Sequence, residues 1–133
     1  MATFNIKTKA LNETATLHLV DPATEIALYA DDAEKKPLQI VINGKASKAY
    51  RNALSALLRK GAARKGKASF ENNVEDNNNL LAEISVEAVN FDMGDGPIKT
   101  KEQFVALYSE PSLYWIKDQV SSFLEAPESF STK

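Results

Sequence analysis

The spacing of the apolar residues changes within one stretch of the chain, LQIVINGKASKAYRNALSALL (residues 38–58). In its first part alternate residues are apolar, which is typical of a half-buried strand: Leu38, Ile40 and Ile42. In its second part the apolar residues recur at helical spacing: Tyr50, Leu54, Leu57 and Leu58. We expect the strand to stop at Asn43 and Gly44, Ser47 to cap the helix, and Gly61 to end it.

The residues before this stretch predict more strands. Apolar residues alternate over 15–19 and again over 25–29, and the turn-forming run 21–24 (Asp-Pro-Ala-Thr) separates them. Residues 3–9 can add a strand at the edge. The first part of the chain is therefore predicted to form a small antiparallel sheet with one buried face.

The residues after this predicted helix indicate a break in the regular structure. Five asparagines lie between residues 72 and 79, and few apolar residues occur between 62 and 79. Such a composition buries too little apolar surface to offset the entropy lost on ordering. We expect a mobile linker over 62–79.

Three further helices are predicted beyond this linker. The first covers about 80–89, the second begins at Thr100 with the spacing of a capping box, and the third has its apolar stripe over 113–124 and ends at Pro127. Strands followed by helices indicate an α+β fold, with a small N-terminal antiparallel β-sheet and a C-terminal group of about four helices. We expect a single domain over 1–133, divided into a β-rich part (1–44), a basic helix (45–61), a mobile linker (62–79) and a helical part (80–127).

The predicted core joins both halves of the chain. Leu54 and Leu57 on the basic helix and Ile116 and Val120 on the last helix fall on the apolar faces. We expect these four side chains to pack in one shared interior.

Composition excludes several classes of protein. The chain has 133 residues, 44% of them hydrophobic, and no cysteine, which excludes disulfides, thiolate zinc sites and cysteine nucleophiles. The apolar runs are far shorter than the roughly 20 residues that span a bilayer. Residues 1–7 show no apolar run of signal-peptide length. We expect a soluble protein of a reducing compartment, with no membrane partner.

The net charge of −2 conceals three unequal blocks. Residues 1–44 carry four basic and six acidic side chains, residues 45–70 carry eight basic and no acidic ones, and residues 71–133 carry four basic and twelve acidic ones. Either the basic and acidic blocks lie side by side and neutralise each other, or the basic block is a docking surface for an acidic partner or nucleic acid.

Residues suited to catalysis are scarce. His18 is the single histidine, and the alternation of its strand predicts that it faces solvent. The chain has no nucleophile elbow and no phosphate-binding loop. The run 92–96 (Asp-Met-Gly-Asp-Gly) fails the calcium-loop pattern in both registers, because neither a glycine at the sixth position nor a glutamate at the twelfth follows. We therefore predict no enzyme, no cofactor and no metal site, and a turn at 92–97.

Several aromatic residues gather near the C-terminus, among them Tyr108, Tyr114, Trp115 and Phe130. The apolar stripe of the last helix does not need all of them, and Trp115 falls at its border. Either they pack in the core, or some of them form a partner-binding patch, since Trp and Tyr are frequent interface anchors.

Several segments of the chain resemble the tail assembly chaperones of long-tailed bacteriophages. Members of that family often have a strand that ends in a His-Pro or Asp-Pro turn, and a strand followed by a Gly-x-x-Ser/Asp-x-x-Tyr entry into a basic helix. The corresponding segments here are LVDPAT (19–24), INGKASKAYR (42–51), FVALY (104–108) and IKDQV (116–120). The resemblance covers residues 15–130, although the family's frequent Thr-Gly after the first turn is Thr24-Glu25 here.

The resemblance implies a non-enzymatic function in the cytoplasm of the host cell. Such chaperones bind the long tape measure protein, keep it soluble and promote assembly of the tail tube protein around it, and are absent from the finished virion. The implied partners are the tape measure protein, the tail tube protein and further copies of the chain. The candidate partner-binding residues combine basic and aromatic side chains: Arg59, Lys60, Arg64, Lys65, Tyr108, Tyr114 and Trp115.

Two other functions stay open at this point. The basic segment 45–67 is compatible with a nucleic-acid-binding protein, but its single aromatic residue is Tyr50 and the chain as a whole is not basic. A structural subunit of a phage tail or head is the second alternative.

Overall fold

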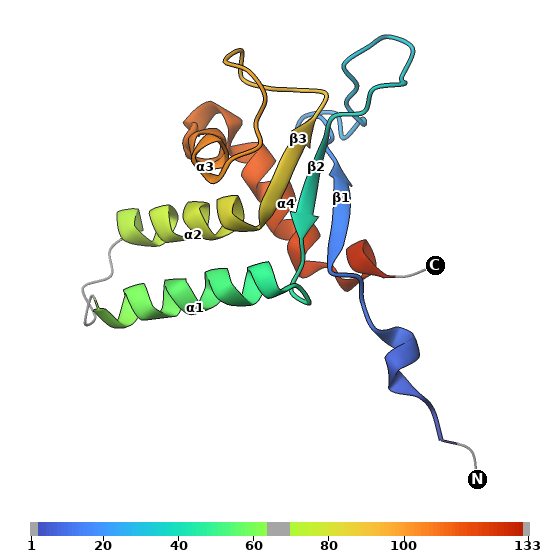
Figure 1. Ribbon diagram of the computed structural model, residues 1–133. Helices are drawn as coiled ribbons and strands as arrows, with labels where there is room; N and C mark the ends of the chain where they lie inside the picture. Colours follow the sequence, from blue (N-terminus) through green and yellow to red (C-terminus); the bar gives the residue numbers. More distant parts are fainter. Residues whose placement is uncertain (1–2, 64–69, 132–133) are drawn as a thin grey trace.

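The computed structural model describes residues 3–63 and 70–131. Figure 1 shows a small sheet with helices beside it and an N-terminal arm that extends away from the body. The elements follow in the order η1 (Ile6–Lys9), β1 (Thr14–His18), β2 (Gln39–Asn43), α1 (Lys48–Ala63), α2 (Phe70–Ile84), β3 (Ser85–Val89), α3 (Lys101–Ser109), η2 (Pro111–Leu113), α4 (Tyr114–Glu125) and η3 (Pro127–Phe130), where η marks a 3-10 helix. The predicted α+β class is confirmed.

The sheet is antiparallel with the strand order β1-β2-β3. Leu17 pairs with Ile40 between the first two strands, and Ile40 pairs with Ala88 between the last two. The strands expected around 15–19 and 38–42 are confirmed within one residue at each end. Since β2 lies in the middle, its two isoleucines are fully buried.

Two of the predicted strands are wrong. Residues 25–29 form isolated bridges rather than a strand, because Asp21 caps a tight turn and Glu25 takes a left-handed φ of 61°. Residues 3–9 contain η1 instead of an edge strand, because the Asn5 side chain accepts a hydrogen bond from the Lys7 amide and closes a 3-10 turn.

The helix predicted over 80–89 is also wrong in its second half. It ends at Ile84, and residues 85–89 are the third strand. The Ser85 hydroxyl lies 2.7 Å from the Leu81 carbonyl oxygen, so its side chain satisfies a carbonyl at the end of the helix. The β-branched and small residues that follow pair with β2, which makes a strand the more stable local structure.

The linker predicted over 62–79 is largely helical. Helix α1 runs past Gly61 to Ala63, so the predicted end of the basic helix at Gly61 is wrong. Helix α2 begins at Phe70, and residues 64–69 lie outside the described ranges. Helix α2 packs on both α1 and α3, and Asp76 and Asn78 are buried in these contacts. Packing therefore overrides the weak helix propensity of asparagine.

The core lies between the sheet and helices α2, α3 and α4. Its largest fully buried side chains are Tyr108, Phe104, Leu19, Ile40, Ile42, Leu81, Ile84, Leu107 and Val120. Ile116 and Val120 belong to it as expected. Leu54 and Leu57 do not, because α1 packs chiefly on α2, and Leu58 is 66% exposed. The prediction that all four residues share one interior is therefore wrong for Leu54 and Leu57.

Candidate binding groove between the first two helices

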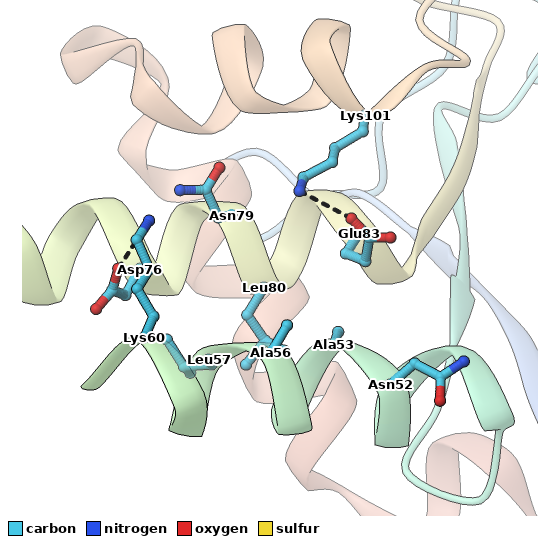
Figure 2. A pocket seen from close by; sticks show the side chains of 10 residues that line it. All are labelled: Asn52, Ala53, Ala56, Leu57, Lys60, Asp76, Asn79, Leu80, Glu83 and Lys101. Atoms are coloured by element: carbon cyan, nitrogen blue, oxygen red, sulfur yellow. Dashed lines mark ion pairs between the residues drawn. The ribbon is translucent and has the colours of Figure 1, made fainter. Parts of the chain in front are cut away.

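A groove runs along the seam between α1 and α2 (Figure 2). Its volume is about 360 Å³, and its floor is formed by Ala53, Ala56, Leu57 and Leu80. The lining is completed by polar residues: Asn52, Lys60, Asp76, Asn79, Glu83 and Lys101. An apolar floor with a polar rim is the usual composition of a binding site.

The two sides of the groove, α1 and α2, are each positioned by contacts at one end of the helix. Helix α1 starts where the Ser47 hydroxyl accepts a hydrogen bond from the Tyr50 amide at 3.1 Å, and the same hydroxyl donates to the Gly44 carbonyl at 2.6 Å. The predicted N-cap at Ser47 is therefore confirmed. Helix α2 runs directly into β3, so the sheet holds its C-terminal end in place. Since Ala53 and Ala56 have only methyl side chains, the seam between the helices is left hollow.

Two ion pairs lie at the rim of the groove. The Lys60 ammonium lies 3.6 Å from an Asp76 carboxylate oxygen, and the Lys101 ammonium lies 3.0 Å from a Glu83 carboxylate oxygen. Figure 2 shows them at opposite ends, with Asn79 between them. Because Asp76 is almost buried whereas the other three are half-exposed, the rim retains charge that a partner can contact.

The adjacency of basic and acidic segments follows from this arrangement. Helix α1 carries four basic residues and no acid, and the described side chains of α2 include three acids and no base. The two helices lie side by side in Figure 1. The charge blocks therefore meet at the seam, as one of the two sequence interpretations expected.

The basic candidate residues lie partly on this groove. Lys60 lines it and Arg59 is exposed on α1 beside it. Arg64 and Lys65 fall outside the described ranges. The basic part of the predicted surface is thus represented in the structure by two side chains of α1.

The aromatic candidates occupy different environments. Tyr114 is 60% exposed at the start of α4, while Trp115 is half-buried against the core. Tyr108 is buried, so its assignment to a partner-binding surface is wrong. Its hydroxyl lies 2.6 Å from the Ser85 hydroxyl, and burial raises the pKa of Tyr108 well above its ordinary value. Phe130 is also buried and packs against Phe123.

Most of the groove was not predicted from the sequence. Ala53, Ala56, Asn79, Leu80 and Glu83 are not among the candidate residues. Asn79 falls in the predicted linker, whereas the others fall in two predicted helices whose packing on each other is a long-range contact that the sequence pattern does not show. The signal that marks them is the spacing of Asp76, Asn79, Leu80 and Glu83, which is that of one helix face.

The remaining chemistry-bearing groups have structural roles. His18 is half-buried rather than facing solvent, because its Nε2 donates to the Leu28 carbonyl at 2.8 Å and its ring meets Tyr29 edge-on. Asp92 accepts from the Gly94 amide at 2.6 Å, and Gly94 and Gly96 both have positive φ, which confirms the predicted turn. Over 3–63 and 70–131 no three His, Cys, Asp or Glu residues group in a way that suits a metal ion.

The described helices lack the length and apolar character that a membrane crossing requires. Comparisons with protein-family models, curated proteins and solved structures return no match to this chain.

Proposed function

We propose that this chain is a tail assembly chaperone that binds a tape measure protein, keeps it soluble and promotes assembly of tail tube protein around it in the host cytoplasm. The observation that carries the proposal is the groove between α1 and α2, whose apolar floor and charged rim suit a protein ligand. The sequence resemblance over residues 15–130 supplies the identity of that ligand.

The physical requirement is a binder of exposed apolar surface. A long helical protein with uncovered apolar faces aggregates until another surface covers them. The groove offers an apolar floor, and Tyr114 offers an exposed aromatic side chain of the kind that anchors interfaces. Neither feature requires a nucleotide, a metal or a covalent step.

The arrangement of charge favours a protein partner over nucleic acid. A phosphate backbone is drawn to basic side chains through a long-range field. Helix α2 carries acidic side chains and packs beside α1, and the Asp76 carboxylate lies 3.6 Å from the Lys60 ammonium, which opposes that field. A folded protein surface with both signs of charge is better matched to this pair of helices.

Co-expression tests the proposal. We expect the tape measure protein of the same phage to become soluble with this chain and to purify with it, without ATP or added metal. The matched control is co-expression with an unrelated small acidic protein. If the tape measure protein stays as insoluble as it is alone, or if this chain instead binds duplex DNA at physiological salt, the proposal is wrong.

A further inference from the structure

Strand β1 forms one edge of the sheet. Strand β2 lies on one side of it and, among the described residues, no strand lies on the other. The Gly44 amide donates to the Glu13 carbonyl at 2.7 Å, and bonding alternates along a strand, so the odd-numbered residues of β1 bond to β2. The backbone N–H and C=O groups of Thr14, Thr16 and His18 therefore point away from the sheet. Such an edge is a template for a further strand.

The chain itself closes this edge at both ends. At the start, the Asn12 amide donates to the Phe130 carbonyl at 2.8 Å. At the far end, the Gln119 side chain donates to the Val20 carbonyl at 2.8 Å and accepts from the Val20 amide at 3.0 Å, as a neighbouring strand would. The stretch between these contacts is residues 14–18, which is the whole of β1.

A hollow lies beside the edge, on the core side of the sheet. Leu17 pairs with the buried Ile40, so both side chains are on this side. The hollow has a volume of about 400 Å³, and its apolar lining comes from Leu17, Val20 and Phe123. A strand added to β1 would place every second side chain over it.

The N-terminal arm, residues 3–11, has apolar side chains without a partner in the fold. All of its residues are exposed, and Figure 1 shows that it leads away from the body. Phe4 is 68% exposed and Ile6 is 72% exposed. The single 3-10 turn of the arm, η1, contains no buried residue, so unwinding it breaks no packing. Covering these two side chains would stabilise any assembly that achieves it.

One register matches the arm to the edge on both faces. With the arm antiparallel to β1, Lys7 lies opposite Thr14, and the following pairs are Ile6 with Ala15, Asn5 with Thr16, Phe4 with Leu17 and Thr3 with His18. The two apolar side chains then lie on the core side over the hollow, and the three polar ones lie on the outer face. Residues 3–7 are the one five-residue window of the arm with large apolar residues at its second and fourth positions.

The charges of the two surfaces are also complementary. The arm carries Lys7 and Lys9 and no acidic residue. The receiving surface, residues 13–18 and 118–123, carries Glu13 and Asp118 and no lysine or arginine. Opposite charge favours the encounter of the two surfaces and fixes their register.

The fold directs the arm away from its own β1. To reach it, the chain would have to reverse direction over residues 8–13. Asn12 is held by Phe130 and Glu13 by Gly44, while Ala10 has an extended backbone with φ −62° and ψ 139°. The 3-10 helix η3 packs against β1 and occupies the place of that turn.

From this match we infer that the arm of one copy adds as a strand to the β1 edge of a second copy, so that the chain self-associates by arm exchange. Main-chain hydrogen bonds along β1 would hold the arm, and the hollow would select its apolar side chains. The inference goes beyond the proposed function, because it concerns this chain alone and its tests need no tape measure protein.

Analytical ultracentrifugation provides the first test. We expect the wild-type chain to form a dimer or larger assembly as its concentration rises. The double variant Phe4→Ala with Ile6→Ala should weaken this association at least tenfold. Leu58→Ala is the matched control, since Leu58 is 66% exposed on α1, and it should change the association less than twofold. Circular dichroism checks that each variant is folded.

Disulfide cross-linking provides the second test, because the chain has no cysteine of its own. Opposed residues of a hydrogen-bonded antiparallel pair have Cα atoms about 5.5 Å apart, which suits a disulfide. Asn5→Cys and Thr16→Cys are made in separate chains that carry tags of different mass, mixed and oxidised. We expect a mixed disulfide at a yield at least tenfold above that of Asn5→Cys mixed with Ser55→Cys, since Ser55 is an exposed residue of α1.

Three results would overturn the inference. The first is a wild-type chain that stays monomeric, or an assembly that Phe4→Ala with Ile6→Ala leaves unchanged. The second is an equal yield of cross-linking to Thr16→Cys and to Ser55→Cys. The third is a chain with both Asn5→Cys and Thr16→Cys that closes its disulfide within a monomer, because the arm then pairs with its own β1.

Discussion

The buried Tyr108 hydroxyl makes the stability of the fold depend on alkaline pH. Its oxygen lies 2.6 Å from the Ser85 hydroxyl, which in turn lies 2.7 Å from the Leu81 carbonyl oxygen. Because a carbonyl only accepts, Ser85 donates its one proton to Leu81, and Tyr108 must donate to Ser85. Ionisation of Tyr108 would place a negative charge in the core. Because burial disfavours the charged form, it raises the pKa of the phenol.

The sign and size of the effect follow from this shift. In the unfolded chain Tyr108 titrates near its ordinary pKa of 10.0, whereas in the folded chain it stays protonated to higher pH. The stabilisation is therefore complete below pH 10 and is lost as the pH rises above it toward the folded pKa. At pH 11 the unfolded phenol is about 90% ionised, so the free energy of unfolding falls by about 1.4 kcal/mol through this group.

Tyr108→Phe isolates that contribution. At pH 7 the variant loses one buried hydrogen bond, and we expect it to be about 0.5–1.5 kcal/mol less stable than the wild type in urea unfolding. At pH 11 this difference should shrink by about 1.4 kcal/mol, because phenylalanine does not titrate. Tyr114→Phe is the matched control, since Tyr114 is exposed, and its stability should follow that of the wild type at every pH. Parallel curves for the wild type and Tyr108→Phe from pH 7 to pH 11 would refute the reasoning.

Two further predictions concern packing. A Cβ atom added at Gly44 would lie 2.5 Å from a ring atom of buried Phe130, so Gly44→Ala should destabilise the fold by about 1–3 kcal/mol in thermal unfolding; an unchanged melting temperature would contradict this packing. Ile116→Ala should cost about 2–5 kcal/mol because Ile116 is buried, whereas Leu58→Ala should cost less than about 0.5 kcal/mol because Leu58 is exposed. Equal losses at these two positions would show that the face assignment is wrong.

Local signals explain what the sequence predicted correctly. The strand before Gly44 and the helix after Ser47 differ in period, and the turn and cap that separate them use only neighbouring residues. The same holds for the capping box at Thr100, where the Gln103 amide donates to the Thr100 hydroxyl and the Gln103 side chain accepts from the Thr100 amide. Hydrogen bonds of this short range leave a pattern in the sequence.

Helix α2 and strand β3 could not be predicted in the same way. Five asparagines cost about 3 kcal/mol relative to alanine in a helix, which favours a linker when the segment is considered alone. Burial of Leu81 and Ile84 stabilises the helix by about 1.5–3 kcal/mol for each side chain, but only after the rest of the fold has formed. The apolar run that follows is compatible with helix or strand, and its pairing with β2 decides between them.

The groove exists only once α2 has packed on α1, and the same packing decides how the basic and acidic blocks of the sequence act. Packed helices lie about 8–10 Å apart, close to the screening length at physiological salt. At larger distances the basic residues of α1 and the acidic residues of α2 therefore largely cancel, and a polyanion is not drawn in from afar. At contact distance the rim still presents charge, because Lys60, Lys101 and Glu83 stay half-exposed in their ion pairs. Neutralisation and docking are thus compatible, and the charge pattern favours recognition at short range.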